Sequence, residues 1–347
     1  MNRRNFNKII ATTSTLLLAG ATTNLAAAKS WNKEDVRHKL IYPPHLKKGD
    51  KVSLICPASP TTKEKLDKAV ANIVSLGLEP VFDEEILLSK KGYLAGSDAL
   101  RLRSLHEAFS NKNTKAVWCV RGGYGTPRIL DAIDYKLIKR NPKVFIGFSD
   151  ITALHVAIHQ HTGLVTFHGT VGVYDFPEYT VKYLKNTLFK SDTYLEIDFP
   201  ESLKSNAYVI TEGSARGNLV GGNLSLLTAL VGTPYACDMK DKIVFIEEIE
   251  ERPYKIDRML TQLLLSGDLR RASAIVLGVF DKCEADPNSD SLTLKETLTD
   301  RLGNLGIPVV YGMPFGHITS QCVIPYGVSA ELLTDGLRLT LEETGVI

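Results

Sequence analysis

The stretch Val-Phe-Ile-Gly-Phe-Ser-Asp-Ile-Thr, residues 144–152, decides the fold class. It begins with a continuous apolar run, which is typical of a strand that is buried on both faces, as strands of a parallel sheet are. The apolar run then passes through a glycine to Ser149 and Asp150, and residues 151–162 are compatible with a helix. The stretch therefore predicts a strand-loop-helix unit.

The same unit recurs on either side of this stretch. Residues 51–56 and 116–120 are further apolar runs, each followed by a turn rich in Pro or Gly. Residues 63–76 carry apolar side chains at helical spacing and end at Gly77. Helices are also expected at 99–109, 151–162 and 181–188, and a strand at 164–167. We therefore expect an α/β domain with a parallel sheet over residues 46–188.

The second half of the chain has a different pattern. A glycine-rich segment, 212–223, leads into an apolar helix at 224–231. Short strands are expected at 242–246, 274–280 and near 309, 323 and 337, and helices at 254–266 and 291–305. These elements indicate an α+β domain at 206–343, joined to the first domain by a weakly periodic linker at 189–205. No internal repeat relates the two halves.

The composition restricts the class of protein. A chain of 347 residues that is 44% hydrophobic and 23% charged exceeds what one core usually serves, so it predicts two globular domains. The formal net charge is +2, and Arg3, Arg4 and Lys8 supply three of the positive charges. The rest of the chain is close to neutral, which argues against nucleic acid as a partner.

The first 28 residues predict an export signal. Arg3 and Arg4 precede an uncharged run from Ile9 to Leu18, and three alanines end at Ala28. This run is too short to cross ~30 Å of hydrocarbon as a helix. The pattern resembles a twin-arginine leader with a small-residue cleavage site, so we expect a periplasmic protein. No later stretch has the length of a membrane span, so no stable insertion is expected after processing.

Cysteine and histidine spacing predicts neither a metal nor a cofactor. The five cysteines lack CxxC spacing, and we expect them to be buried free thiols, although the sequence also allows one disulfide. They are Cys56, Cys119, Cys237, Cys283 and Cys322. His155, His159 and His161 lie close together in sequence but lack an HExxH pattern or a cysteine partner. The glycine-rich segments also lack the GxGxxG pattern of dinucleotide binding.

Four segments have residue types suited to catalysis. Ser149 lies where a helix begins, which suits a nucleophile, although an N-cap is the commoner reason for a serine there, and the GxSxG pattern is absent. Residues 120–125, Val-Arg-Gly-Gly-Tyr-Gly, can expose backbone amides to an oxyanion or simply form a turn. Glu247 ends an apolar run before further acids, which suits either a sheet-edge site or a solvated loop. His317 follows a further apolar segment.

Taken together, the motifs resemble the LD-carboxypeptidases, a family of serine peptidases that act on muramoyltetrapeptides. The matching stretches keep the family order and cover most of the chain after the leader. They are VRGGYG at 120–125, GFSDITALH at 147–155, GGNLSLL at 221–227, EEIEERPYKIDRML at 247–260 and FGH at 315–317.

The resemblance implies a catalytic triad with an oxyanion hole. Ser149 would be the nucleophile, His317 the general base and then acid, and Glu247 the residue that orients the imidazole. The amides of Gly123 and Asp150 would stabilise the oxyanion. The substrate would be a murein tetrapeptide that loses its terminal D-alanine, and Arg121 could bind the carboxylate, unless it is an ion-paired structural residue.

The resemblance also implies a fold and an assembly. The first domain would be flavodoxin-like or Rossmann-like, the second would consist of short strands and helices, and the chain would form a homodimer. Two alternatives remain. One is a peptidase of the microcin C immunity type, against which the export leader argues. The other is a periplasmic solute-binding protein, which has no reason to bring Ser149, Glu247 and His317 together.

Overall fold

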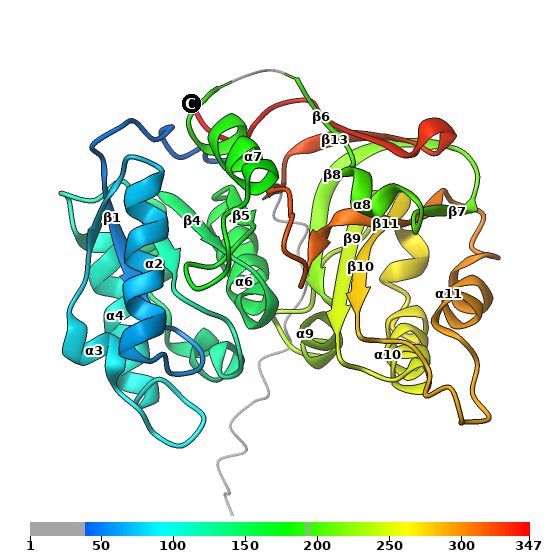
Figure 1. Ribbon diagram of the computed structural model, residues 1–347, viewed down its shortest axis with the longest axis horizontal. Helices are drawn as coiled ribbons and strands as arrows, with labels where there is room; N and C mark the ends of the chain where they lie inside the picture. Colours follow the sequence, from blue (N-terminus) through cyan, green and yellow to red (C-terminus); the bar gives the residue numbers. More distant parts are fainter. Residues whose placement is uncertain (1–38, 192–193) are drawn as a thin grey trace, which may run out of the picture. The chain divides into compact units, whose positions relative to one another are not determined.

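Strand β4 (Val144–Gly147) lies inside a six-stranded sheet with the order β12-β5-β4-β3-β1-β2. The computed structural model describes residues 39–191 and 194–347 (Figure 1). Four strands join β4 in this sheet through parallel pairings: β1 (Lys51–Ile55), β2 (Glu79–Val81), β3 (Ala116–Cys119) and β5 (Thr166–His168). The order β2-β1-β3-β4-β5 is that of flavodoxin-like folds, which confirms the expected α/β class.

The first half contains the four helices that the periodicity predicts and two short helices, at 84–88 and 135–140, that it does not. They are α2 (Lys63–Ser75), α3 (Glu84–Leu88), α4 (Asp98–Ser110), α5 (Tyr135–Arg140), α6 (Thr152–Thr162) and α7 (Glu178–Leu188). Helix α2 shows why they form. The hydroxyl of Thr62 caps its first turn by accepting a hydrogen bond from the Lys65 amide, and Leu66 and Ile73 are buried on one face.

A second sheet has eight strands in the order β6-β14-β13-β8-β9-β10-β11-β7. Its middle is formed by four parallel strands: β8 (Ser214–Asn223), β9 (Lys242–Ile249), β10 (Ala274–Asp281) and β11 (Val309–Gly316). Antiparallel strands flank them: β6 (Leu195–Ile197), β7 (Tyr208–Thr211), β13 (Ser329–Leu333) and β14 (Arg338–Leu341). Its helices are α8 (Glu201–Lys204), α9 (Leu224–Ala229), α10 (Pro253–Leu265) and α11 (Leu294–Leu302).

The glycine-rich segment leads into a helix, α9, as expected, but it is itself a strand that the sequence pattern did not predict. It forms β8, a ten-residue strand at the centre of the second sheet. Gly221 shows why this strand contains glycine. Its φ is +144°, and a Cβ atom there would lie 1.8 Å from the carbonyl oxygen of Phe245. Only glycine permits this approach of two backbones. Residues 189–205, the expected linker, include both β6 and α8.

The C-terminal part of the chain returns to the first sheet. Strand β12 (Ile324–Tyr326) pairs antiparallel with β5, so that Ile324 lies opposite His168. The first sheet is therefore completed by residues that follow the second sheet's parallel strands in sequence.

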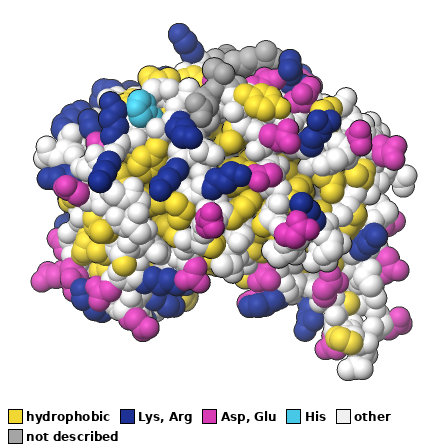
Figure 2. All heavy atoms as spheres, turned by 45° about the horizontal axis from the view of Figure 1, so that its top comes forward, with side chains coloured by type: hydrophobic (Ala, Val, Ile, Leu, Met, Phe, Trp, Pro, Cys, Tyr) yellow, Lys and Arg dark blue, Asp and Glu magenta, His cyan; other side chains and the backbone are white. Residues whose placement is uncertain are grey.

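The side chains of the described residues confirm one sequence prediction and leave another untested. All five cysteines are free and buried. No helix among residues 39–191 and 194–347 is long and apolar enough to span a membrane. The predicted export signal at 1–28 lies outside the described residues. Basic and acidic side chains are interspersed on the face shown in Figure 2.

Candidate active site

Ser149 follows β4 in a strained backbone conformation. Its φ is +64°, in the left-handed region that costs a non-glycine residue about 1 kcal/mol or more. The alternative role as an N-cap does not apply, because Phe148 and Ile151 occupy the two N-cap positions and neither helix start has a side-chain cap. Strain of this kind persists where the surrounding fold enforces it, and it is concentrated at functional sites.

The glycine turn after β3 packs directly against Ser149. A Cβ atom on Gly122 would lie 3.0 Å from the Ser149 Cβ and 3.3 Å from its Oγ. Gly123 has a φ of +114°, and a Cβ atom there would lie 2.3 Å from the hydroxyl of Ser59. This hydroxyl accepts a hydrogen bond of 3.0 Å from the Tyr124 amide. Glycine is therefore required at position 123, and any side chain at position 122 would crowd Ser149.

Asp150 links the serine to the same turn. Its carboxylate accepts a hydrogen bond of 2.8 Å from the Thr126 amide, and the Thr126 hydroxyl donates to the Asp150 carbonyl at 2.5 Å. Among the described residues, no hydrogen bond engages the amides of Gly123 and Asp150. Both amides therefore have the free donor capacity that an oxyanion hole requires. The structural role of the Asp150 carboxylate was not predicted from the sequence.

A buried arginine holds the glycine turn from behind. One terminal nitrogen of Arg101, Nη1, donates to the carbonyls of Pro57 at 2.6 Å and Gly125 at 2.8 Å. The Arg101 side chain is fully buried, and its other terminal nitrogen pairs with Asp98 at 2.5 Å. The guanidinium therefore joins the turn after β1 to the turn after β3.

Replacing Arg101 with methionine is expected to destabilise the protein by about 2 to 4 kcal/mol, because two buried carbonyls lose their donors. Urea unfolding followed by circular dichroism measures this loss. Arg128→Met is the matched control: Arg128 pairs with the same Asp98 but is 43% exposed, so its removal should cost less than about 1 kcal/mol. Equal losses for both variants would contradict the role given to Arg101.

Glu247 and His317 form a hydrogen-bonded pair at the ends of β9 and β11. The Nδ1 atom of His317 lies 2.7 Å from the Glu247 Oε2, with side-chain exposures of 7% and 0%. Gly316 permits this contact, because a Cβ atom there would lie 2.8 Å from the Val279 carbonyl and 3.1 Å from the Glu247 Cβ. Because the carboxylate only accepts, Nδ1 carries the proton and Nε2 is the basic nitrogen.

The charge of Glu247 sets the basicity of the imidazole. Burial alone would lower the pKa of His317, but the neighbouring Glu247 carboxylate and its hydrogen bond raise that pKa above the usual histidine value. A neutral imidazole with a raised pKa is a strong base for its class, and the adjacent carboxylate stabilises the imidazolium that forms.

An aromatic contact brings the pair to the serine. The ring of Phe148 lies 4.7 Å from the His317 ring, centroid to centroid, and Phe148 directly precedes Ser149. Ser149 and His317 share no hydrogen bond within the described residues. Such contacts are commonly long in unliganded enzymes and tighten when substrate binds. Residues from the first and the second sheet therefore meet at this point.

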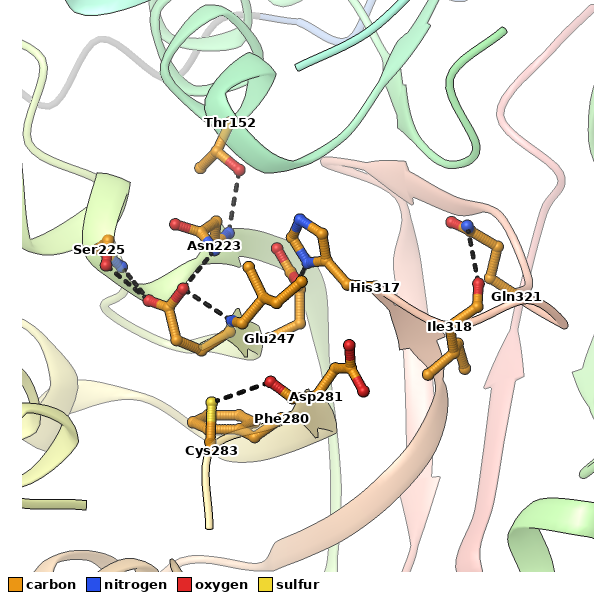
Figure 3. A network of polar contacts seen from close by, with 12 residues as sticks. Thr152, Asn223, Ser225, Glu247, Phe280, Asp281, Cys283, His317, Ile318 and Gln321 are labelled. Atoms are coloured by element: carbon orange, nitrogen blue, oxygen red, sulfur yellow. Dashed lines mark hydrogen bonds and ion pairs between the residues drawn. The ribbon is translucent and has the colours of Figure 1, made fainter. Parts of the chain in front are cut away.

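A second set of hydrogen bonds ties the two sheets together beside this pair. Thr152, Asn223 and Ser225 gather next to Glu247 and His317 in Figure 3. The Thr152 hydroxyl accepts from the Asn223 amide at 2.9 Å. The Asn223 side chain and the Ser225 amide donate in turn to the carboxylate of Glu248, at 2.9 and 2.8 Å.

Glu248 is buried through these contacts, next in sequence to Glu247. Burial, followed by the charge of Glu247, raises the pKa of the Glu248 carboxyl. The network therefore fixes α6, which begins three residues after Ser149, relative to the strand that carries Glu247.

Thr152→Val is expected to lower kcat about 10-fold with little change in KM, because the buried Asn223 amide loses its acceptor and the two sheets shift relative to each other. Steady-state kinetics on the murein tetrapeptide that the family resemblance implies as substrate measures this effect. Thr152→Ser keeps the hydroxyl and should retain near-normal kcat. A valine variant with unchanged kcat would show that the network is not needed for alignment.

Arg121 and the three clustered histidines have specific partners in the structure. Arg121 donates to the Pro60 carbonyl at 2.9 Å, and it forms no ion pair in the part of the chain that the structure describes. The ion pair of the structural alternative is therefore not found among these residues, whereas the hydrogen bond to Pro60 gives Arg121 a structural contact. The Nε2 of His155 lies 2.8 Å from the Gly147 carbonyl, so this histidine supports the turn before Ser149. Residues 39–191 and 194–347 contain no group of three metal-ligating side chains.

Comparison with known proteins identifies both halves of the chain. Residues 52–169 match the N-terminal domain of LD-carboxypeptidases, and residues 216–332 match their C-terminal domain. A Bacillus subtilis relative named "Probable murein peptide carboxypeptidase" is 43% identical, with 88% of this chain and 93% of the relative covered. The murein tetrapeptide carboxypeptidase of Pseudomonas aeruginosa is 31% identical, covering 83% and 94%.

Solved structures agree with these matches. A muramoyltetrapeptide carboxypeptidase from Oxalobacter formigenes has a TM-score of 0.73 at 30% identity, covering 84% of this chain and 97% of that one. A microcin self-immunity protein has a TM-score of 0.81 at 24% identity, covering 88% of this chain and all of that one, which shows a shared fold alone. On the two domain matches and the identities above, the chain belongs to the LD-carboxypeptidase family of peptidases.

Proposed function

We propose that this protein is a serine LD-carboxypeptidase that releases the terminal D-alanine of murein tetrapeptides. The observation that carries the proposal is the buried Glu247–His317 hydrogen bond of 2.7 Å, packed through Phe148 against a serine in a left-handed conformation. An imidazole held in this way beside a hydroxyl is the arrangement that activates a serine nucleophile.

The reaction follows from the free atoms at this site. His317 Nε2 takes the Ser149 proton as the hydroxyl oxygen attacks the carbonyl carbon of the L,D-amide bond. The amides of Gly123 and Asp150 stabilise the oxyanion, an effect that is typically worth ~10²- to 10³-fold in rate per donor. The imidazolium then protonates the leaving amine of D-alanine. Water hydrolyses the acyl-enzyme by the same base, and free Ser149 is restored.

The fold explains why the active site needs both sheets. Ser149 and the glycine turn follow β4 and β3 of the first sheet, whereas Glu247 and His317 lie at the ends of β9 and β11 of the second. All four positions are at carboxyl ends of parallel strands, where α/β proteins bind their ligands. Domain packing should therefore affect the rate as well as the stability.

The proposal is tested by incubating the purified protein with a panel of muropeptides and analysing the products by mass spectrometry. Tetrapeptides should lose one alanine, while pentapeptides and tripeptides remain intact. An aminoacyl-sulfamoyl-adenosine serves as the test of the microcin-type alternative. Cleavage of that compound with intact tetrapeptide would overturn the proposal. Membership of a peptidase family already argues against the solute-binding alternative.

We also propose that the protein acts in the periplasm as a homodimer. The twin arginines Arg3 and Arg4 ahead of an uncharged run support export, and the family resemblance supports the dimer. Replacing both arginines with lysine should keep the protein in the cytoplasmic fraction of the cells. Light scattering on the purified protein should give twice the chain mass. A variant that is still exported, or a monomer, would contradict the respective claim.

A further inference from the structure

Two side chains beside Ser149 have hydrogen-bonding groups that the protein itself does not use. Arg121 donates to the Pro60 carbonyl through Nη1 and forms no ion pair within residues 39–191 and 194–347. The hydroxyl of Tyr174 has no hydrogen-bond partner in the same part of the chain; only the backbone of Tyr174 is bonded. A half-buried guanidinium and a half-buried phenol are thus both available to a ligand.

Backbone hydrogen bonds place these two residues side by side. The loop after β5 runs along the end of β3: the amide of Gly172 donates to the Cys119 carbonyl, and that of Val173 to the Val120 carbonyl, both at 3.0 Å. Arg121 and Tyr174 are the next residues on the two segments. The loop is also anchored, since the Asn72 side chain donates to the Tyr174 carbonyl at 2.7 Å.

Both residues adjoin the reacting serine. Arg121 directly precedes Gly122, where an added Cβ atom would lie 3.0 Å from the Cβ atom of Ser149. The ring of Tyr174 packs edge-on against Phe148 at 5.2 Å, and Phe148 precedes Ser149 and contacts His317. The arginine and the tyrosine therefore flank the nucleophile on the side of the first sheet.

On the other side of Ser149, where the second sheet lies, the charges near His317 are mainly negative. Asp281 ends β10 and Glu250 follows β9, both near His317, and Glu250 is already paired with Lys282 at 2.9 Å. An anionic group of the substrate would be repelled by Asp281 and attracted to Arg121. Burial raises the pKa of Tyr174, as do the charges of Glu247 and Asp281, so the phenol keeps its proton and can donate.

We propose that Arg121 and Tyr174 together bind the free terminal carboxylate of the substrate's leaving residue and so restrict the enzyme to the last peptide bond. This inference rests on the proposed function. In a C-terminal residue the carboxylate carbon is two bonds of ~1.5 Å each from the scissile nitrogen. Its binding groups must therefore adjoin the nucleophile, as these two do. Guanidinium and hydroxyl donors both form strong bonds with a carboxylate.

The test compares two peptides that differ only at the terminus: the tetrapeptide acid and its C-terminal amide. The unaltered enzyme should prefer the acid by about 100-fold or more in kcat/KM. Arg121→Gln should lose about 100-fold on the acid, mainly through KM, and less than about 3-fold on the amide. Tyr174→Phe should lose about 5- to 10-fold on the acid alone. Arg128→Gln, an exposed arginine, should leave both values unchanged.

A binding measurement separates this inference from the function on which it rests. Calorimetry with the Ser149→Ala protein should show tetrapeptide binding that the double variant Ser149→Ala/Arg121→Gln loses. If Arg121→Gln and Tyr174→Phe keep the full preference for the acid while hydrolysis still depends on Ser149, the carboxylate site is wrong and the function stands. If the unaltered enzyme binds the acid but cleaves neither peptide, the function itself is wrong.

Discussion

Ser149→Ala is expected to reduce release of D-alanine from the murein tetrapeptide by roughly 10⁴-fold or more, because the acyl-enzyme can no longer form. The measurement is a chromatographic assay of free D-alanine over an extended incubation. Circular dichroism and thermal unfolding should show an intact fold, since the Ser149 hydroxyl has no hydrogen bond in the described structure. Turnover within a factor of ten of the unaltered enzyme would reject Ser149 as the nucleophile.

Ser149→Gly provides a matched comparison. The left-handed φ of +64° strains both serine and alanine but not glycine. The glycine variant should be equally inactive yet more stable than the alanine variant by about 1 kcal/mol. Loss of activity without loss of stability would separate the chemical role of the hydroxyl from any effect on folding.

Glu247→Gln is expected to lower kcat by about 10³- to 10⁴-fold, because a neutral amide neither orients the correct tautomer of His317 nor stabilises its charged form. The pH dependence of kcat/KM should also differ between the variant and the unaltered enzyme. The base must be neutral to act, so activity rises with pH through the raised pKa of His317. Without the carboxylate this pKa falls, so the acid limb of kcat/KM moves to lower pH in the variant.

The matched control for this substitution is Glu250→Gln. Glu250 belongs to the same acidic segment, but its carboxylate is 65% exposed and pairs with Lys282. Solvent screening makes its effect on His317 weak, so both kcat and the acid limb should change little. If Glu250→Gln shifted the pH profile as far as Glu247→Gln, the histidine would respond to general charge rather than to its hydrogen-bond partner.

The elements that could be predicted are those with a strong local pattern. The run Val144–Gly147 and the helix after it, α6, follow from continuous hydrophobicity and helical spacing. Strand β8 could not be predicted, because glycine has no local preference for strands. Its glycines are there because the backbone of β8 approaches β9 closely.

The candidate site likewise contains residues that the sequence predicts and contacts that it does not. Residue types and motif order point to Ser149, Glu247 and His317, and two of these, Glu247 and His317, form the hydrogen bond that the chemistry needs. The contacts that align them are long-range: Thr152 reaches Asn223, and Arg101 reaches Pro57. Because such partners are distant in sequence and polar rather than periodic, no local pattern reveals them.

Strand β12 has a consequence for how the chain acquires its fold during synthesis. The open edge of β5 is not covered until residues 324–326 emerge, long after β5 itself (Thr166–His168) has been made. Until then the growing N-terminal half exposes unpaired backbone groups, which is a site for aggregation with other nascent chains. Truncation before Ile324 should therefore yield insoluble protein even though the nucleophile's own strand and helix are complete.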